Sequence, residues 1–180
     1  MRRVLFVVTL LIAAFAARAG AQSDWKAELA QRLPLLGHRN WILIADSAYP
    51  LQTSPGIETI ETNADQVEVV RYVLAQVNSS IHVRPEIFMD AELPYVPEQD
   101  APGANAYRRA IAQVLSGYKI GSVLHDKLIA EMGQSSQSFH VLVLKTNLTV
   151  PYTSVFIRLN CKYWPSDAEN RMRAQMPSTK

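Results

Sequence analysis

Short apolar runs alternate along the chain with segments whose apolar residues recur every three or four positions. Continuous apolar runs between turn residues are typical of buried strands, and a period of 3.6 is typical of amphipathic helices. The expected strands are residues 40–45, 57–61, 81–89, 118–123, 139–145 and 153–159. The expected helices begin near residues 24, 63, 104 and 125. Strands that alternate with helices predict an α/β domain, here a three-layer α/β/α sandwich with a mixed sheet.

Prolines mark the irregular parts of this pattern. Residues 47–56 and 90–103 each contain several prolines and are expected to be loops. Pro85 interrupts the third expected strand, and because proline lacks a backbone N–H, it predicts an edge position or a bulge there. The polar residues 165–180 predict a mobile tail.

The N-terminus has the organisation of a secretory signal peptide. Arg2 and Arg3 precede an apolar stretch over residues 4–17, and Ala19-Gly20-Ala21 offers small residues for cleavage. The apolar stretch is shorter than the about 20 residues that a membrane helix needs, although an uncleaved anchor is an alternative. We therefore predict a signal peptide over residues 1–21 and a single domain over residues 22–164. The protein is expected in the periplasm or outside the cell, without a stable membrane anchor.

The net charge and the cysteine content limit which binding partners and which disulfide bonds are expected. The formal net charge is +2, and removal of Arg2, Arg3 and Arg18 with the signal peptide leaves −1. No polybasic run remains, so nucleic acid is not expected as a partner. Cys161 is the only cysteine, which rules out an intramolecular disulfide and predicts a buried, reduced thiol.

Polar residues stand on both sides of the first expected strand. His38 follows Gly37 before the strand, and Asp46 follows its last residue, Ala45. Ligands of open α/β sheets bind at the carboxyl ends of strands, which places Asp46 where a site is expected. One extended strand holds the two side chains apart, so a shared role requires that the chain or neighbouring subunits fold around one pocket. The structural alternatives are a helix cap for His38 and a turn for Asp46.

The order and spacing of Leu36-Gly37-His38, Asp46, Pro50 and Pro151-Tyr152 resemble the D-ribose pyranase / L-fucose mutarotase (RbsD/FucU) family, over residues 28–163. This resemblance implies an isomerase that interconverts ring forms or anomers of a free monosaccharide by acid/base ring opening, with no metal and no other cofactor. It implies that His38 carries the proton, that Asp46 orients His38 or accepts hydrogen bonds from the sugar, and that Tyr152 positions the sugar ring.

The same resemblance implies further residues and an assembly. His125 resembles the second active-site histidine of the ribose branch, and Lys127 follows it two positions later. Ser154 stands where that branch has asparagine, and residues 134–138 look like an insertion. His125, Lys127 and Ser154 are therefore predicted to bind substrate. Family members form rings of five that can stack into decamers, which implies a homo-oligomer with each pocket completed by a neighbour.

Three other functions compete with this interpretation. Ala45-Asp46-Ser47 is similar to a block of lipase-like esterases, but the chain has no Asp-x-x-His segment to supply the base for a Ser47 nucleophile. A metal enzyme is not expected, because the four histidines lack H-x-x-x-H spacing and the cysteine is solitary. The remaining alternative is a non-catalytic exported sugar-binding or assembly protein on the same fold.

The export prediction is checked by N-terminal sequencing of the protein purified from its natural host. The mature chain is expected outside the cytosol and is expected to begin after Ala19 or Ala21. A cytosolic chain that still begins at Met1 would contradict export and leave the predicted sugar chemistry untouched.

Overall fold

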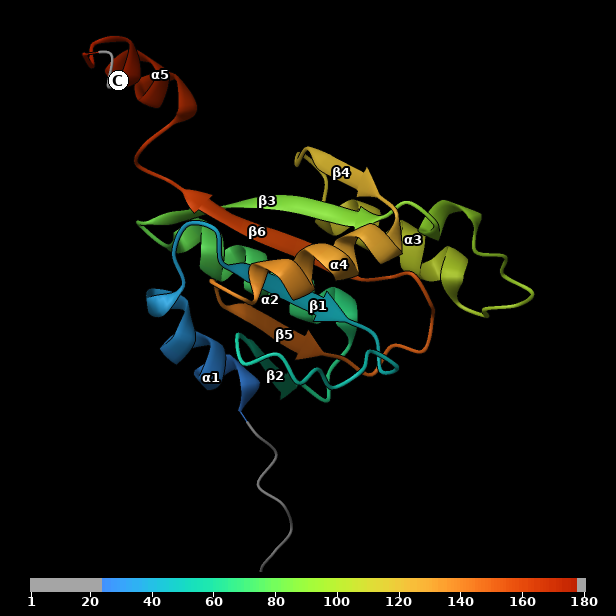
Figure 1. The fold of residues 1–180 in the computed structure, drawn as a ribbon. Coiled ribbons are helices and arrows are strands. Elements are labelled where there is room, and N and C mark those ends of the chain that lie inside the picture. Colours follow the sequence, from blue (N-terminus) through green and yellow to red (C-terminus); the bar gives the residue numbers. More distant parts are fainter. Residues whose placement is uncertain (1–23, 178–180) are drawn as a thin grey trace, which may run out of the picture.

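The structure is a computed structural model that describes residues 24–177, so the predicted signal peptide lies outside the described residues. Figure 1 shows the arrangement of the elements in this range. None of the helices in this range combines the length and the apolar character that a membrane span requires. The elements are α1 (Trp25–Arg32), β1 (Trp41–Ala45), β2 (Ile57–Glu61), α2 (Gln66–Ser79), β3 (Val83–Asp90), α3 (Ala104–Val114), β4 (Ile120–Val123), α4 (His125–Ser135), β5 (Val141–Lys145), β6 (Val155–Cys161) and α5 (Ser166–Ala174), with 3-10 turns at Leu33–Leu35 and Leu93–Tyr95.

The strands form one mixed sheet in the order β2-β5-β1-β6-β3-β4. β1 and β2 each pair in parallel with β5, and β3 pairs in parallel with β4. β6 pairs antiparallel with both β1 and β3, so it runs against the other strands. The ends of β1 to β5 and the beginning of β6 therefore lie along one edge, on the right of Figure 1. We call this the carboxyl edge and the opposite one the amino edge.

Helices cover both faces of the sheet, which confirms the predicted α/β sandwich. Successive residues of a strand point to opposite faces, so the apolar run of β1 serves two cores. Ile42 and Ile44 belong to the core that α1, α2 and α3 complete. Trp41 and Leu43 belong to a second core, which Leu128 and Met132 of α4 complete together with Tyr49, Val143 and Phe156.

Pro85 lies where the sheet tolerates a missing N–H. It pairs with Leu159 of β6 on one side, whereas β4 pairs with β3 only from Ile87 onward. The other side of β3 is unpaired at Pro85, as proline requires. The expected edge position is therefore right for the first half of β3, although the second half lies between two strands.

Side-chain caps set the beginnings of two helices. Asp24 accepts a hydrogen bond from the Ala27 N–H at 3.2 Å, as expected for the first helix. Asp65 accepts from the Glu68 N–H at 3.0 Å, so α2 begins at Gln66 and not at Asn63 as the pattern predicted.

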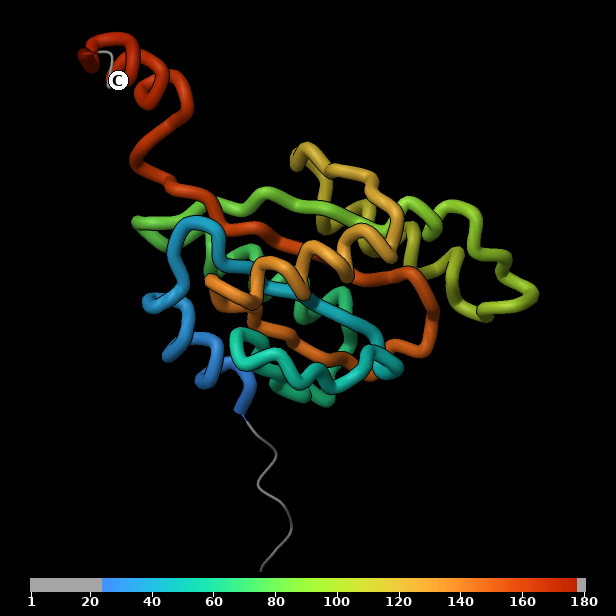
Figure 2. The backbone as a smooth tube through the Cα atoms, in the orientation of Figure 1, coloured from blue at the N-terminus to red at the C-terminus, as the bar shows by residue number. Residues whose placement is uncertain are grey.

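The polar C-terminal segment contains a helix that the pattern did not predict. α5 has no buried residue, and Figure 2 shows that it stands away from the sheet. The ion pairs Arg171–Asp167 and Arg173–Glu169, each at 2.6 Å and one helical turn apart, stabilise it. Because the helix buries no apolar face, its sequence has no apolar stripe from which to recognise it.

A buried amide ties several elements together beneath the carboxyl edge. The Gln66 side chain, fully buried at the start of α2, donates to the Thr153 carbonyl at 2.5 Å and to the Tyr107 hydroxyl at 2.9 Å. Its oxygen accepts from the Thr146 hydroxyl at 3.0 Å. The Tyr107 hydroxyl also donates to the Thr153 carbonyl at 2.7 Å, and burial raises the pKa of this phenol. The segment before β6 is thereby fixed to α2, α3 and the end of β5.

Replacing this amide tests how much the network stabilises the fold. Gln66→Leu is expected to lower the free energy of unfolding by about 3 kcal/mol, because it removes three buried hydrogen bonds, those to Thr153, Tyr107 and Thr146. Gln113→Leu, on the exposed side of α3, is the matched control and is expected to change it by less than about 0.5 kcal/mol. Urea denaturation of both variants measures the difference, and equal midpoints would contradict the structural role of Gln66.

Candidate functional site

A cavity of about 630 Å³ opens at the carboxyl edge of the sheet. It is lined by residues 46–50 after β1, by His125, Asp126 and Ile129 of α4, and by residues 149–152 before β6. The loop before β6 reaches this edge because β6 runs against its neighbours (Figure 1). The position agrees with the rule that ligands bind outside the carboxyl ends of strands.

Asp46 lies at the cavity, as its place after β1 predicted. Its Oδ1 accepts a hydrogen bond from the Ala48 N–H at 2.8 Å, which turns the chain out of the strand. The carboxylate therefore has the structural role expected of a turn residue and also lines the cavity, whereas its functional role stays a prediction.

Tyr152 lines the cavity with a strained backbone. Its φ of 56° lies in the left-handed region, which costs a non-glycine residue about 1–2 kcal/mol. The next residue is held firmly, because the Thr153 hydroxyl donates to the Val150 carbonyl at 2.8 Å. Backbone strain of this kind is concentrated at functional sites. In this conformation the Tyr152 side chain lines the cavity, and 41% of the residue is exposed.

His125 joins the cavity as the first residue of α4. Its backbone N–H donates to both carboxylate oxygens of Glu92, each at 3.1 Å, so Glu92 fixes the start of the helix. Its Nδ1 lies 3.0 Å from Asp90 Oδ1. The rings of His125 and Tyr152 meet edge to face, with their centroids 5.5 Å apart. The predicted site residues Asp46, His125 and Tyr152 therefore lie around one cavity.

Sequence reasoning missed Asp90, which lies directly behind His125. Asp90 ends β3, and its side chain is fully buried. Burial raises the pKa of its carboxyl group, while the hydrogen bonds from His125 and from the Ser154 N–H act in the opposite direction. An Asp at the end of an apolar strand, the same signal that pointed to Asp46, could have identified it. The pattern instead assigned Asp90 to the long loop 90–103.

Two predicted binding residues lie outside the cavity lining. Ser154 is fully buried, and within residues 24–177 its hydroxyl has no hydrogen-bond partner. Its backbone N–H donates to Asp90 Oδ2 at 3.2 Å. Lys127 is exposed on α4 and is not among the residues that line the cavity. Substrate contact by either side chain stays a prediction.

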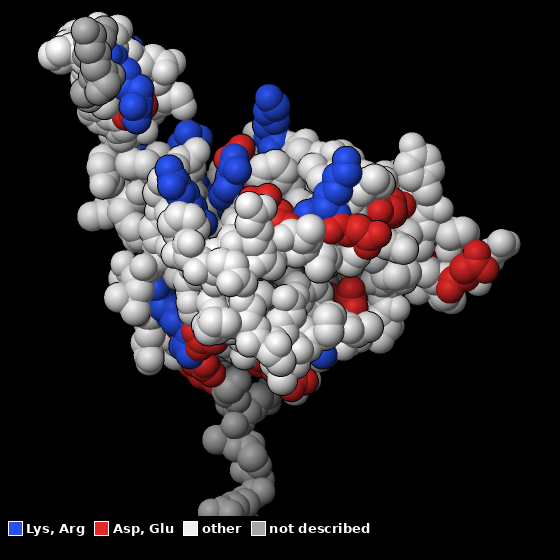
Figure 3. Space-filling view, viewed as in Figure 1, with Lys and Arg blue, Asp and Glu red and all other residues white. Residues whose placement is uncertain are grey.

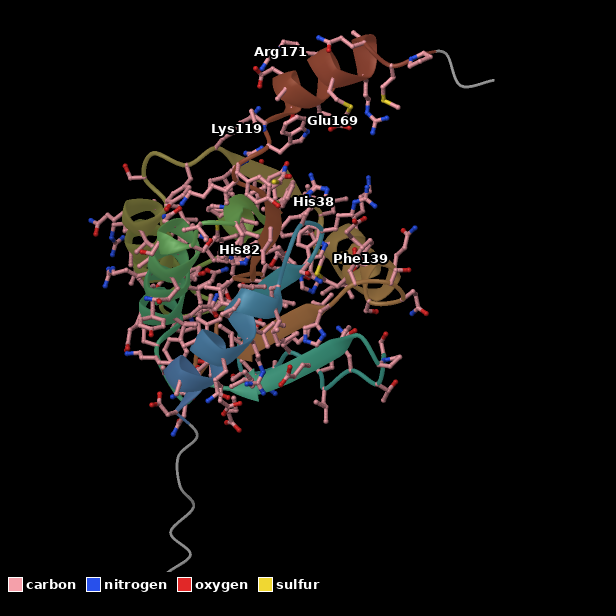
Figure 4. The ribbon with its side chains drawn as sticks, turned by 90° about the vertical axis from the view of Figure 1, so that its left-hand side faces the viewer. His38, His82, Lys119, Phe139, Glu169 and Arg171 are labelled. Carbon is pink, nitrogen blue, oxygen red and sulfur yellow. The ribbon has the colours of Figure 1, made fainter. Side chains whose placement is uncertain are left out.

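His38 lies at the amino edge, on the side that faces the viewer in Figure 4. Its Nδ1 is 3.0 Å from Asn160 Oδ1 at the end of β6, and it lines a different cavity, of about 620 Å³, with Cys161 and Trp164. β1 lies between His38 and Asp46 and alone spans about 13 Å from Trp41 to Ala45, at about 3.3 Å per residue. One chain therefore does not bring His38 to Asp46, and their shared role stays a prediction that requires a second copy.

The other two histidines and the cysteine have structural surroundings. His82 Nε2 lies 3.1 Å from the Leu36 carbonyl oxygen, and His140 Nε2 lies 3.3 Å from Glu58 Oε2. Both contacts agree with the structural roles expected for these residues. Cys161 is half-buried at the end of β6, so the thiol is less enclosed than expected.

The cavity combines hydrogen-bonding groups with apolar walls. Asp46 and Asp126 supply carboxylates, and His125 supplies an imidazole, the side chain best suited to exchange protons near neutral pH. Ile129 and Val150 are among the apolar lining, and burial raises the pKa of the Tyr49 phenol to about 12, so that it stays protonated. Figure 3 shows acidic side chains on the right, towards the carboxyl edge, and basic ones mainly at the upper left. The cavity therefore places hydrogen-bonding groups and an imidazole beside apolar walls.

Two solved structures share this fold at low sequence identity, and a third has a lower TM-score. Bacillus subtilis RbsD complexed with D-ribose has a TM-score of 0.52 at 15% identity, covering 73% of this chain and 90% of that chain. FucU from Bifidobacterium longum has a TM-score of 0.50 at 13% identity, covering 73% and 92%. The fucose mutarotase of Streptococcus pneumoniae in complex with L-fucose has a TM-score of 0.46 at 17% identity, covering 73% and 89%.

The sequence itself gives the family. No curated protein sequence matches the chain. The sequence profile of the RbsD / FucU transport protein family matches residues 23–161, which include every strand of the sheet and the whole lining of the carboxyl-edge cavity. The chain therefore belongs to the RbsD / FucU family.

Proposed function

We propose that the protein is a monosaccharide mutarotase or pyranase that interconverts ring forms or anomers of a free sugar. The observation that carries this proposal is the convergence of Asp46, His125 and Tyr152, from three separate segments, on one cavity at the carboxyl edge. Membership of the RbsD / FucU family supports a sugar as the ligand, as does the D-ribose bound to the B. subtilis relative of the same fold.

Opening of a sugar ring needs one proton removed from the anomeric hydroxyl and one delivered to the ring oxygen. His125 is the histidine that the chain itself brings to the cavity, and it exchanges these protons. The Asp46 carboxylate accepts hydrogen bonds from sugar hydroxyls, and the exposed Tyr152 side chain positions the ring. The reaction transfers only protons and uses neither a metal nor another cofactor.

A second copy of the chain completes the site in this proposal by adding His38, a second imidazole that hydrogen-bonds the sugar and assists the proton exchange. His38 lies at the amino edge, so it reaches a cavity only when a neighbouring subunit presents its amino edge to the carboxyl edge of this one. The exposed Tyr163 and Trp164, 74% and 45% accessible, follow β6 at the amino edge and suit a contact between subunits. A ring of five, single or stacked into a decamer, is the proposed assembly, and the signal-like N-terminus makes the proposed location periplasmic or extracellular.

The catalytic role of His125 is tested by anomer exchange on D-ribose, L-fucose and D-glucose, measured by NMR saturation transfer. His125→Ala is expected to lower the accelerated exchange about 100-fold or more while the far-UV circular dichroism spectrum stays unchanged, since it removes the proton carrier. His140→Ala, which removes a histidine bound to Glu58, is the matched control and is expected to retain the rate.

Two results would count against this function. Wild-type exchange rates in His125→Ala would show that another group carries the proton. A wild-type protein that binds one of these sugars but accelerates none would favour the non-catalytic sugar-binding alternative.

Shared sites are tested by mixing two variants. His38→Ala and His125→Ala are each expected to lose most of the activity alone, and oligomers reassembled from equal amounts are expected to recover about a quarter of it, because only some shared sites then hold both histidines. Sedimentation velocity measures the assembly of the same samples. A stable monomer at micromolar concentration, or no recovery in verified mixed oligomers, would contradict a site built from two copies.

A further inference from the structure

The reaction proposed for His125, Asp46 and Tyr152 leaves the buried carboxylate of Asp90 without a role. Its side chain is fully buried at the end of β3, where an unpaired charge is strongly destabilising. Two hydrogen bonds compensate, one from the Ser154 N–H to Oδ2 at 3.2 Å and one between Oδ1 and His125 Nδ1 at 3.0 Å. A buried carboxylate that contacts a residue of the cavity lining suggests a functional role.

The direction of these hydrogen bonds determines where the imidazole carries its proton. A backbone N–H only donates, so Oδ2 is an acceptor. An ionised carboxylate accepts at both oxygens, and Nδ1 of His125 must therefore carry a hydrogen that points at Oδ1. In the neutral ring the lone pair then lies on Nε2, the nitrogen that remains for a ligand in the cavity.

Other contacts hold the ring in this orientation. Glu92 accepts from the His125 backbone N–H at 3.1 Å with both oxygens, so the first residue of α4 cannot shift along the helix axis without losing them. Tyr152 meets the imidazole edge to face at a centroid distance of 5.5 Å. The side chain keeps 28% of its surface exposed, so its free nitrogen can reach a molecule in the cavity.

We propose that Asp90 is a positioning residue that holds His125 with its proton on Nδ1 and its Nε2 lone pair directed at the anomeric hydroxyl of the sugar. Nε2 takes the hydroxyl proton, the C1–O1 bond becomes a carbonyl, and the bond between C1 and the ring oxygen breaks. The ring oxygen then receives the same proton from the imidazolium, which the Asp90 carboxylate stabilises meanwhile. Closure from the other face, or by another hydroxyl, completes the exchange without any co-reactant.

A second histidine–carboxylate pair shows what a structural pair looks like in the same chain. His140 and Glu58 are 3.3 Å apart, and their side chains are 38% and 34% exposed. Glu58 is shared with Arg32, whose guanidinium lowers the pKa of that carboxyl group, and neither residue lines the carboxyl-edge cavity. The Asp90–His125 pair differs in the full burial of its carboxylate and in the exposure of its imidazole to the cavity.

Asp90→Asn gives a sharp test, because the Ser154 N–H dictates how the new amide must turn. The amide oxygen is required as the acceptor for Ser154, so the NH₂ group faces His125 Nδ1, which then has to accept. The proton is thereby forced onto Nε2, and the base in the cavity is lost. In wild type, the imidazole ¹⁵N shifts of His125, assigned by comparison with His125→Ala, are expected to show hydrogen on Nδ1, and in Asp90→Asn on Nε2.

The kinetic counterpart is a separation of kcat from KM. Asp90→Asn is expected to reduce kcat for anomer exchange about 100-fold or more and to leave KM within about threefold, because the cavity keeps its shape. Glu58→Gln is the matched control at the other pair and is expected to leave the His125 tautomer and the rate unchanged.

The outcomes separate this inference from the proposed function on which its catalytic half rests. Hydrogen on Nε2 in the wild-type protein, or an unchanged tautomer in Asp90→Asn, overturns the positioning role whatever the sugar chemistry. A switched tautomer with an unchanged kcat overturns its catalytic use. A switched tautomer in a protein whose wild type accelerates no sugar supports the positioning role and contradicts the proposed function. The wild-type spectrum alone decides the first point even where a variant fails to fold.

Discussion

The direction of β6 determines where the candidate functional side chains of this molecule can lie together. Because β6 runs against the rest of the sheet, its beginning lies at the same edge as the ends of its neighbours. The loop that carries Tyr152 and the loop that carries Asp46 therefore line the same cavity, and α4 begins there with His125. If β6 were parallel, the residues before it would lie at the amino edge, and the cavity would lack one of its walls. The same geometry places Asn160 at the amino edge, next to His38.

Two buried polar groups support this edge from below. Gln66 binds groups of α3, of the chain after β5 and of the chain before β6, and Asp90 joins β3 to α4 and β6. A buried polar group with satisfied hydrogen bonds favours a single arrangement of its surroundings, since every alternative leaves donors or acceptors unpaired. The loops around the cavity consequently stand on a rigid base, which suits a site whose groups must hold a ligand in one orientation.

The sequence predicted the parts of the fold that depend on local pattern. Continuous apolar runs located the strands, and Asp46 could be placed at the carboxyl edge because it directly follows one. The pattern did not reveal α5, which buries no apolar face, or the start of α2, which depends on a cap. The pairing of Asp90 with His125 joins residues 35 positions apart, with α3 and β4 between them in the chain, so no local period encodes it. His38 could be chosen from a family resemblance, and its place before β1 already indicated that an extended strand separates it from Asp46. Only the structure shows that the rest of the chain does not fold the two residues together.

The left-handed backbone at Tyr152 affects which residues are favoured at this position during evolution. The side chain is largely outside the core, so its loss would leave no hole, and a residue without a β-carbon would sit there with less strain. Selection for heat tolerance alone would therefore tend to replace the tyrosine by glycine or asparagine. A lineage that keeps an aromatic ring here is keeping it against the preference of the backbone, as expected when stability is traded for a ligand. Aromatic residues at this position across distant relatives would thus record continued use of the cavity, and their replacement by glycine would mark lineages that have abandoned it.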